Sequence, residues 1–488
     1  MVKKKSTIAL LALAFLMLFV MNCNTFKNKS GNTIGSWPGY QPLPKGFGYM
    51  DTVKLKRAYD NGDIQALRVH AWSLFAGIMQ PASNGTGWPL WYTWPNSVAA
   101  MEIEQIYANS LKSAQQLQNS ALIKMSQLRG TSSVSTPAPK YPIPLAVIHS
   151  YGRYHVFTDS TNSQIIPGKH FMFNGDILIP TESISLEGYN WIQNNRYYAK
   201  SAMDSLYHQG IRNLDAPVTY VITKHMYWPV LASQLCALPV WDTTYYENTD
   251  TGYVGYETWK RIIAIDPTNQ RGGQTASVTY LFGVDAHDGT PINPIRTASA
   301  PVHNINEFYF HKITQADWDS LDYYDKASLN ASSYWAYNQP IGVGDYLVTI
   351  AMHINTKELE SWTMQSAWWT DQPSVGSGSH NRPNLPAAKD TTWKHYNMID
   401  AYGIPVSATD QLPVASNPYI ELVSHPMATN CNNCHMRTGY PEGQNDPLKA
   451  SYQSPACPDL LQKLTPTTPC LAHYTRTDFQ WIIGDYTH

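Results

Sequence analysis

Apolar residues recur at helical spacing in several stretches of the chain. Between residues 51 and 79 they fall three or four positions apart and would share one side of a helix. The stretch 98–128 is rich in Ala, Glu, Gln, Lys and Leu, which predicts a long amphipathic helix. Further helices are expected over 189–209 and 314–329. The apolar positions of the first stretch are Leu55, Ala58, Ile64, Leu67, Ala71, Leu74 and Phe75.

The middle of the chain has a different pattern. Short runs of β-branched and aromatic residues alternate there with turn-forming residues, as is typical of an antiparallel sheet or a sandwich. The sequence therefore predicts an α+β fold with a β-rich core, N-terminal helices and an irregular C-terminal segment. The strand-like runs cover residues 145–148, 170–173, 218–223, 261–265, 276–282 and 346–353.

The N-terminus carries the pattern of an export signal. Lysines at positions 3–5 precede an apolar run over 8–21, which is shorter than the roughly 20 residues of a membrane-spanning helix. The run leads to Cys23 as in a bacterial lipobox, where the cysteine becomes the lipidated N-terminus. Asn22 departs from the small residue usual before that cysteine, so a plain secretory signal is the alternative. We expect an exported protein, held by lipid in the periplasm or at the outer membrane.

Composition narrows the classes of partner. The chain has 488 residues and a formal net charge of -2, and charged residues make up 14% of it. So balanced a charge does not favour a nucleic-acid partner. Aromatic rings with a polar group are frequent, with 16 Trp and 32 Tyr against 12 Phe, and they suit wet clefts as well as half-buried packing. Trp88, Trp91 and Trp94 are spaced like a stacking platform for a glycan, although packing within the loop would also explain them.

The strongest chemical signal is the run Cys431-Asn-Asn-Cys434-His435. Two cysteines at this spacing can bond the two vinyl groups of a c-type haem, and the histidine after them is then the proximal ligand of the iron. Zinc would need a second set of Cys or His ligands at suitable spacing, and a thioredoxin-like site would need a strand before the motif and an amphipathic helix after it. The sequence therefore predicts one covalently attached haem c, with His435 on its iron.

The sixth position of that iron is less defined. No methionine follows Met436 in the chain, and Met436 adjoins the proximal ligand and cannot reach across the ring. The downstream methionine that small cytochromes use is therefore excluded. His353, His473 and Met352 are the candidate distal ligands or pocket residues, and water or an empty position are the alternatives.

The remaining cysteines and the overall patterns complete the organisation. Cys457 and Cys470 lie in a Pro/Thr-rich loop and are expected to form a disulfide in an oxidising compartment, with two free thiols as the alternative. Cys236 has apolar neighbours and is expected to be buried. Five parts are predicted: a signal peptide (1–22), a lipid-anchored flexible tether (23–46), a helical region (47–130), a β-rich main domain (145–400) and a c-type haem-binding segment (401–488).

A series of short phrases resembles a known family. The phrases occupy residues 71–81, 91–94, 351–358, 362–366, 417–421, 430–435 and 477–481. Near Trp362 the family usually continues with a Thr-Phe-Glu-His-like phrase, whereas this chain has Gln365-Ser-Ala-Trp-Trp, so no role of that histidine carries over. In their order the phrases resemble large single-haem c-type cytochrome proteins of Gram-negative bacteria. The resemblance implies haem and a periplasmic location, and it implies no substrate.

Two classes of function follow from these observations. The first is a monohaem redox protein that exchanges electrons with a partner protein or a small-molecule donor or acceptor. Since a simple carrier needs only about 100 residues around the ring, a haem-dependent oxidoreductase with an open sixth position is included in this class. The second is a lipid-anchored binding module for a glycan or another ligand, with haem as a sensor or stabiliser. A hydrolase is disfavoured because the chain has no nucleophile elbow, zinc-binding helix motif or phosphate loop.

Overall fold

A computed structural model describes a large part of the chain. The export signal with Cys23, the expected helix at 98–128 beyond residue 101, and the strand-like runs at 145–148 and 170–173 lie outside the described residues. Within the expected tether, β1 (Phe26–Lys27) and β2 (Thr33–Ile34) form an antiparallel pair. The described residues are 26–27, 33–34, 40–45, 47–49, 51–82, 89–101, 179–241, 259–282, 294–321, 323–383, 391–403, 414–421, 430–441, 457, 462–465 and 467–486.

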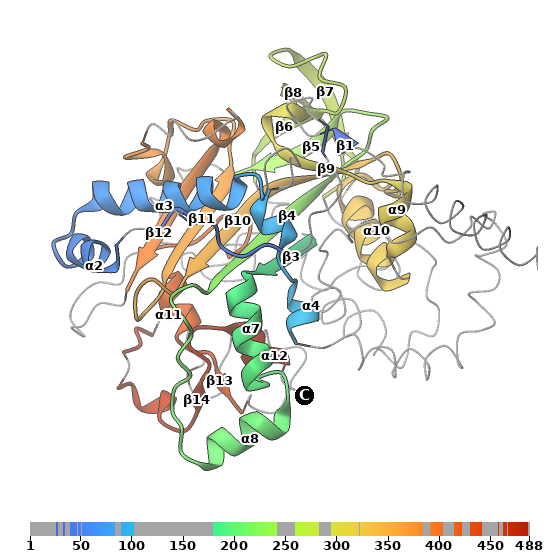
Figure 1. The fold of residues 1–488 in the computed structure, drawn as a ribbon. Helices are drawn as coiled ribbons and strands as arrows, with labels where there is room; N and C mark the ends of the chain where they lie inside the picture. The colour runs from blue at the N-terminus through green and yellow to red at the C-terminus, as the bar shows by residue number, and fades with distance from the viewer. Residues whose placement is uncertain are drawn as a thin grey trace, which may run out of the picture.

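An antiparallel six-stranded sheet forms the centre of the fold (Figure 1). Its main order is β12-β11-β10-β4-β3. Strand β9 pairs with the first part of β10, on the edge that β11 occupies further along. The strands are β3 (Ile179–Ile184), β4 (Val221–Val230), β9 (Tyr309–Lys312), β10 (Tyr346–Thr356), β11 (Thr363–Trp369) and β12 (Tyr396–Tyr402).

A second sheet has four strands in the order β5-β6-β8-β7. Strands β6 and β8 are parallel and the other pairs are antiparallel, so this sheet is mixed. One apolar cluster extends through both sheets, and the indole N–H of Trp228 in the main sheet donates to the carbonyl of Ala237 in the second, 3.1 Å away. The described residues therefore form a mixed α+β fold, as predicted. The strands are β5 (Cys236–Val240), β6 (Arg261–Asp266), β7 (Thr275–Tyr280) and β8 (Arg296–Asn304).

Each helical stretch expected in the described ranges is divided in two. The first consists of α2 (Thr52–Asp60) and α3 (Ile64–Met79), separated at Gly62, whose φ of 65° cannot continue a right-handed helix. None of the helices in the described ranges is long and apolar enough to cross a membrane. The other helices are α4 (Ser97–Ala100), α7 (Leu186–Asn195), α8 (Lys200–His208), α9 (Gln315–Ser320), α10 (Tyr323–Tyr337), α11 (Cys431–His435) and α12 (Trp481–Tyr486).

The two faces of the main sheet carry different side chains. Alternate residues of a strand point to opposite sides, and cross-strand partners point to the same side. Lys224 of β4 is paired with His353 of β10, so these two residues share one face. Their chain neighbours His225 and Met352 are paired with each other and share the opposite face.

Different segments cover these faces. Helix α3 crosses the strands on the side of Met352, and its Arg68 forms an ion pair with Asp400 of β12 (Figure 1). We call this side the α3 face. On the side of His353, Asn417 donates to the hydroxyl of Ser366 in β11, and Cys431 of α11 packs in one apolar cluster with residues of β11 and β12. We call this side the α11 face.

Candidate functional site

The Cys-x-x-Cys-His run forms the short helix α11. The side chain of Asn430 caps its N-terminus by accepting a hydrogen bond from the N–H of Asn433 at 3.1 Å. In a helix, side chains at positions i, i+3 and i+4 lie on the same side. Cys431, Cys434 and His435 have this spacing, so the two thiols and the imidazole share one side of α11.

The two asparagines between the cysteines anchor the opposite side of α11. Asn432 and Asn433 are fully buried. The amide of Asn432 donates to the carbonyl of Trp362 in the turn between β10 and β11, at 3.3 Å. The amide of Asn433 donates to Gln462 O at 3.1 Å, and its oxygen accepts from Leu464 N at 2.8 Å. The two residues between the cysteines therefore hold α11 in place, and the thiols and the imidazole on its other side are not needed for this.

The tautomer of His435 is defined by one backbone contact. His435 Nδ1 lies 2.9 Å from the carbonyl oxygen of Phe479. Because a carbonyl only accepts, Nδ1 must carry the proton, and Nε2 then has the lone pair that binds a metal. Burial lowers the pKa of His435 to about 4, and the hydrogen bond to Phe479 opposes this shift only in part. The imidazole is therefore neutral near pH 7, as coordination to iron requires.

The two thiols of the motif do not have the character of a redox dithiol. Cys431 and Cys434 are free, and the thiol of Cys431 donates to Ala415 O at 3.0 Å. Burial raises the pKa of Cys431 well above its ordinary value and that of Cys434 to about 12. A dithiol oxidoreductase instead depends on a lowered thiol pKa. Within the described ranges, no group of three or more His, Cys, Asp or Glu side chains could hold a metal ion, so a zinc site gains no support there.

His353 lies on the α11 face with charged neighbours. Its Nε2 is 2.9 Å from Glu421 Oε1, although the two groups are not aligned as a hydrogen bond. Lys224 Nζ, on the adjacent strand, is 3.9 Å from Glu182 Oε1. The side chains of His353 and Glu421 retain 11% and 13% of their exposure and that of Lys224 retains 33%, so the cluster lies at the boundary between the interior and the surface. The structure thus brings His353 to the sheet face that carries the motif.

The other two candidate ligands have different surroundings. Met352 is fully buried on the α3 face, where its cross-strand partner is His225. His473 is exposed on the turn that follows Leu471. His353 therefore shares the α11 face with the motif, and Met352 does not.

The disulfide loop supports the motif from outside the sheet. Cys457 and Cys470, which the sequence predicts to pair, are joined by a disulfide. They pack with Met436 and Leu464 in a small apolar cluster directly after α11. Cys236 is buried in the main core, as its apolar neighbours predict.

Two tryptophans of the tryptophan-rich loop are described, and both are buried. Trp91 is 5% exposed and Trp94 is 2% exposed, and both belong to the main apolar core. The ring of Trp91 stacks on the imidazole of His225 with a centroid distance of 3.7 Å. Trp88 lies outside the described residues. These two tryptophans therefore act in packing on the α3 face and offer no stacking platform for a glycan.

The sequence pattern does not identify two of the groups at this site, and it identifies a third only weakly. The carbonyl of Phe479 belongs to the backbone, which every residue has, so no residue type marks it. Glu421 lies 68 positions from His353 in the numbering, and only the folded chain brings them together. Lys224 has a weak signal, because it precedes His225 in a strand-like run with mixed polar and aromatic residues.

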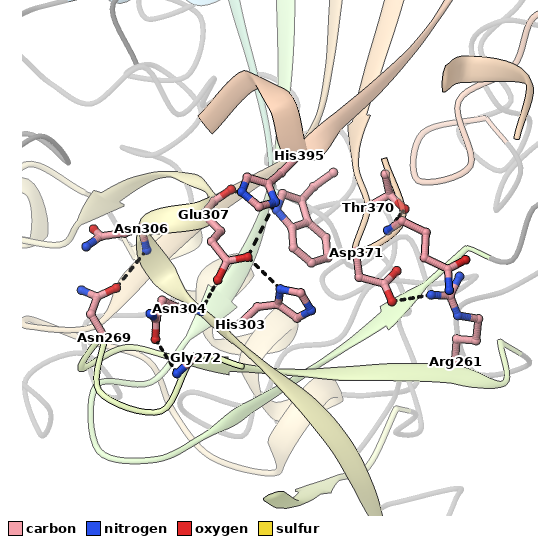
Figure 2. Close-up of polar contacts among 12 residues, drawn as sticks. Arg261, Asn269, Gly272, His303, Asn304, Asn306, Glu307, Thr370, Asp371 and His395 are labelled. Carbon is pink, nitrogen blue, oxygen red and sulfur yellow. Dashed lines mark hydrogen bonds and ion pairs between the residues drawn. The ribbon is translucent and has the colours of Figure 1, made fainter. Parts of the chain in front are cut away.

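A second polar cluster lies between the two sheets, away from the motif. Figure 2 shows Glu307 between two histidines, with its Oε2 at 2.8 Å from His303 Nδ1 and 3.6 Å from His395 Nδ1. In the same view Arg261 of β6 forms an ion pair with Asp371, which follows β11. These contacts link the second sheet to the main sheet, and we interpret them as structural.

Comparisons with protein-family models, curated proteins and solved structures find no match for this chain. The resemblance to single-haem c-type cytochrome proteins therefore stays a prediction from the sequence. A function has to be inferred from the chemistry of the chain's own side chains.

Proposed function

We propose that this protein is an exported, lipid-anchored monohaem c-type cytochrome protein that acts in electron transfer or haem-dependent redox chemistry. One observation carries the proposal: Cys431, Cys434 and His435 share one side of α11, and the Phe479 carbonyl leaves the lone pair on His435 Nε2. That arrangement matches the requirements of covalent haem attachment and iron ligation. Lipid on Cys23 would hold the protein at the membrane.

The residues of α11 have separate roles in this proposal. The thiols of Cys431 and Cys434 form the covalent bonds to haem, and His435 supplies the proximal nitrogen. Haem supplies one-electron chemistry at its iron when it is bound. Asn432 holds α11 against the turn between β10 and β11, and Asn433 holds it against Gln462, so haem bound to this helix would be attached to the main fold.

His353 decides between the two forms of redox function. If its imidazole binds the iron, the haem is six-coordinate and suited to electron transfer with a partner protein or a small molecule. If the imidazole stays paired with Glu421, the sixth position is open, and the histidine is placed as a polar group for haem-dependent chemistry. The location of His353 on the α11 face supports either role.

Haem attachment is tested by expressing the exported chain with a cytochrome c maturation system. We expect one covalently bound haem per chain in a pyridine haemochrome assay. Cys431→Ser with Cys434→Ser should abolish the covalent signal, whereas the matched control Cys236→Ser should retain it, because that thiol is buried in the main core. A wild-type chain without covalent haem would refute the proposal.

A further inference from the structure

The backbone that supplies the Phe479 carbonyl has an unfavourable conformation. Asp478 and Phe479 have φ values of 53° and 65°. Residues with a Cβ atom rarely adopt this left-handed region, and two in succession need support from the surrounding structure. The carbonyl held in this way is the one that accepts from His435 Nδ1 at 2.9 Å.

The support comes from a buried carboxylate with partners on both of its oxygens. Asp478 Oδ1 lies 2.8 Å from Lys357 Nζ, and Asp478 Oδ2 accepts from the backbone N–H of Ala216 at 2.8 Å. Lys357 Nζ also donates to the carbonyl of Glu360 at 3.1 Å. The side chains of Asp478 and Lys357 are only 2% and 8% exposed. Such a pair is held firmly, since losing either partner would leave the other charge buried.

We propose that Lys357 and Asp478 are positioning residues that hold the Phe479 carbonyl against His435 and so determine which ring nitrogen faces the haem iron. This inference rests on the proposed function for its effect on haem. The part of the inference that concerns the tautomer of His435 does not depend on haem, and it applies to the protein without haem.

The Lys357–Asp478 pair also connects the strand that carries His353 with the segment that contacts His435. Lys357 follows the last residue of β10, the strand that carries His353. Its backbone N–H donates to the carbonyl of Tyr220 at 3.1 Å, which fixes this turn against the residue before β4. Strand β10 therefore positions His353, the candidate distal ligand. Lys357, directly after this strand, supports the carbonyl that accepts from His435, the proposed proximal ligand.

The expected consequence follows from the hydrogen bond to Nδ1. A carbonyl that accepts this proton makes the imidazole a better electron donor through Nε2, which favours the oxidised iron. Weakening the bond should therefore shift the reduction potential to a more positive value. In the protein without haem, it should raise the share of the tautomer that is protonated at Nε2.

The test compares Asp478→Asn and Lys357→Met with a control pair elsewhere. Heteronuclear NMR of the imidazole nitrogens, assigned with His435→Gln, measures the tautomer in the protein without haem, and redox titration measures the potential of the haem form. We expect the ratio of the Nδ1–H to the Nε2–H tautomer to fall roughly two- to tenfold, the effect of one net hydrogen bond, with a more positive potential. Lys357→Arg retains the charge pair and should stay close to wild type.

The control variant is Asp371→Asn. It breaks the ion pair with Arg261 that Figure 2 shows, and it touches neither α11 nor Phe479. The double variant Lys357→Met with Asp478→Asn removes both charges. It takes the place of Asp478→Asn in the comparison if that single variant does not fold. An unchanged tautomer ratio and an unchanged potential in the folded variants, or the same shifts in Asp371→Asn, would overturn the positioning role. A wild-type chain that binds no haem overturns the proposed function instead, and the NMR ratio still decides the positioning.

Discussion

A buried histidine faces a carboxylate on each side of the main sheet, and the two pairs differ in how completely they are bonded. On the α3 face, His70 Nδ1 lies 2.7 Å from Tyr402 Oη and its Nε2 lies 2.9 Å from Glu358 Oε2, and the side chains of His70 and Glu358 are both fully buried. On the α11 face, His353 has one contact to Glu421 without hydrogen-bond alignment, and part of its side chain is exposed.

This difference separates a stabilising network from a candidate site. Tyr402 donates to the carbonyl of Leu67 at 3.0 Å, and Glu358 Oε2 also accepts from Thr356 at 2.7 Å, so the network around His70 joins α3 to the strands. A buried network with its polar groups satisfied is rigid and costly to break. His353 is bonded less completely, and it can therefore change partner, which a ligand of haem or of a substrate requires.

The largest expected effect is on the α3 face. Glu358→Ala would leave His70 and Thr356 without their shared acceptor in the core. We expect the free energy of unfolding to fall by about 3–5 kcal/mol, measured by urea denaturation, because one member of a fully buried pair is removed and its partner stays in the core. Covalent haem should still form in the fraction that folds. A loss below about 1 kcal/mol would show that this network contributes little stability.

A second effect on the same face depends on pH. Burial lowers the pKa of His225 to about 3, and neither ring nitrogen has a hydrogen-bond partner. Below its unfolded pKa of about 6.5 the unfolded chain binds a proton that the folded chain does not, so stability falls as the pH decreases from there towards 3. Relative to His225→Phe, wild type should lose up to about 2.7 kcal/mol between roughly pH 6.5 and 4.5. Parallel stability curves for the two proteins would contradict this.

On the α11 face we expect a smaller stability effect with a larger chemical one. His353→Ala removes a side chain whose contact to Glu421 is not aligned as a hydrogen bond, and it should cost about 1–2 kcal/mol in urea denaturation. The ferric absorption spectrum of the haem form, recorded with and without cyanide, should change, because this imidazole lies on the sheet face that carries the motif. An unchanged spectrum would remove His353 from the haem site.

The smallest effect is expected for Met352, the residue directly before His353. Met352→Leu conserves volume on the α3 face and should change the free energy of unfolding by less than about 1.5 kcal/mol. The ferric spectrum should match wild type, because this side chain points away from α11. A spectral change as large as that of His353→Ala would show that the assignment of the two faces is wrong.

Part of the fold could be predicted because its signals are local. The runs at 261–265, 276–282 and 346–353 correspond to β6, β7 and β10. Strand β11 escaped prediction because all of its residues are buried, so polar Gln365 and Ser366 interrupt its apolar pattern without an alternation that marks a strand. The helix expected over 51–79 is broken at Gly62, whose φ of 65° the apolar spacing does not reveal.

What the sequence determined by itself is the chemistry of α11. The spacing of Cys431, Cys434 and His435 puts them on one side of a helical turn, because neighbours three and four positions apart are placed by the chain itself. Only the tertiary structure decided the rest. The Phe479 carbonyl meets His435 from 44 positions away, and Asp478 meets Lys357 from 121 positions away. Such contacts depend on strand register and on packing between distant segments, which no short stretch of sequence encodes.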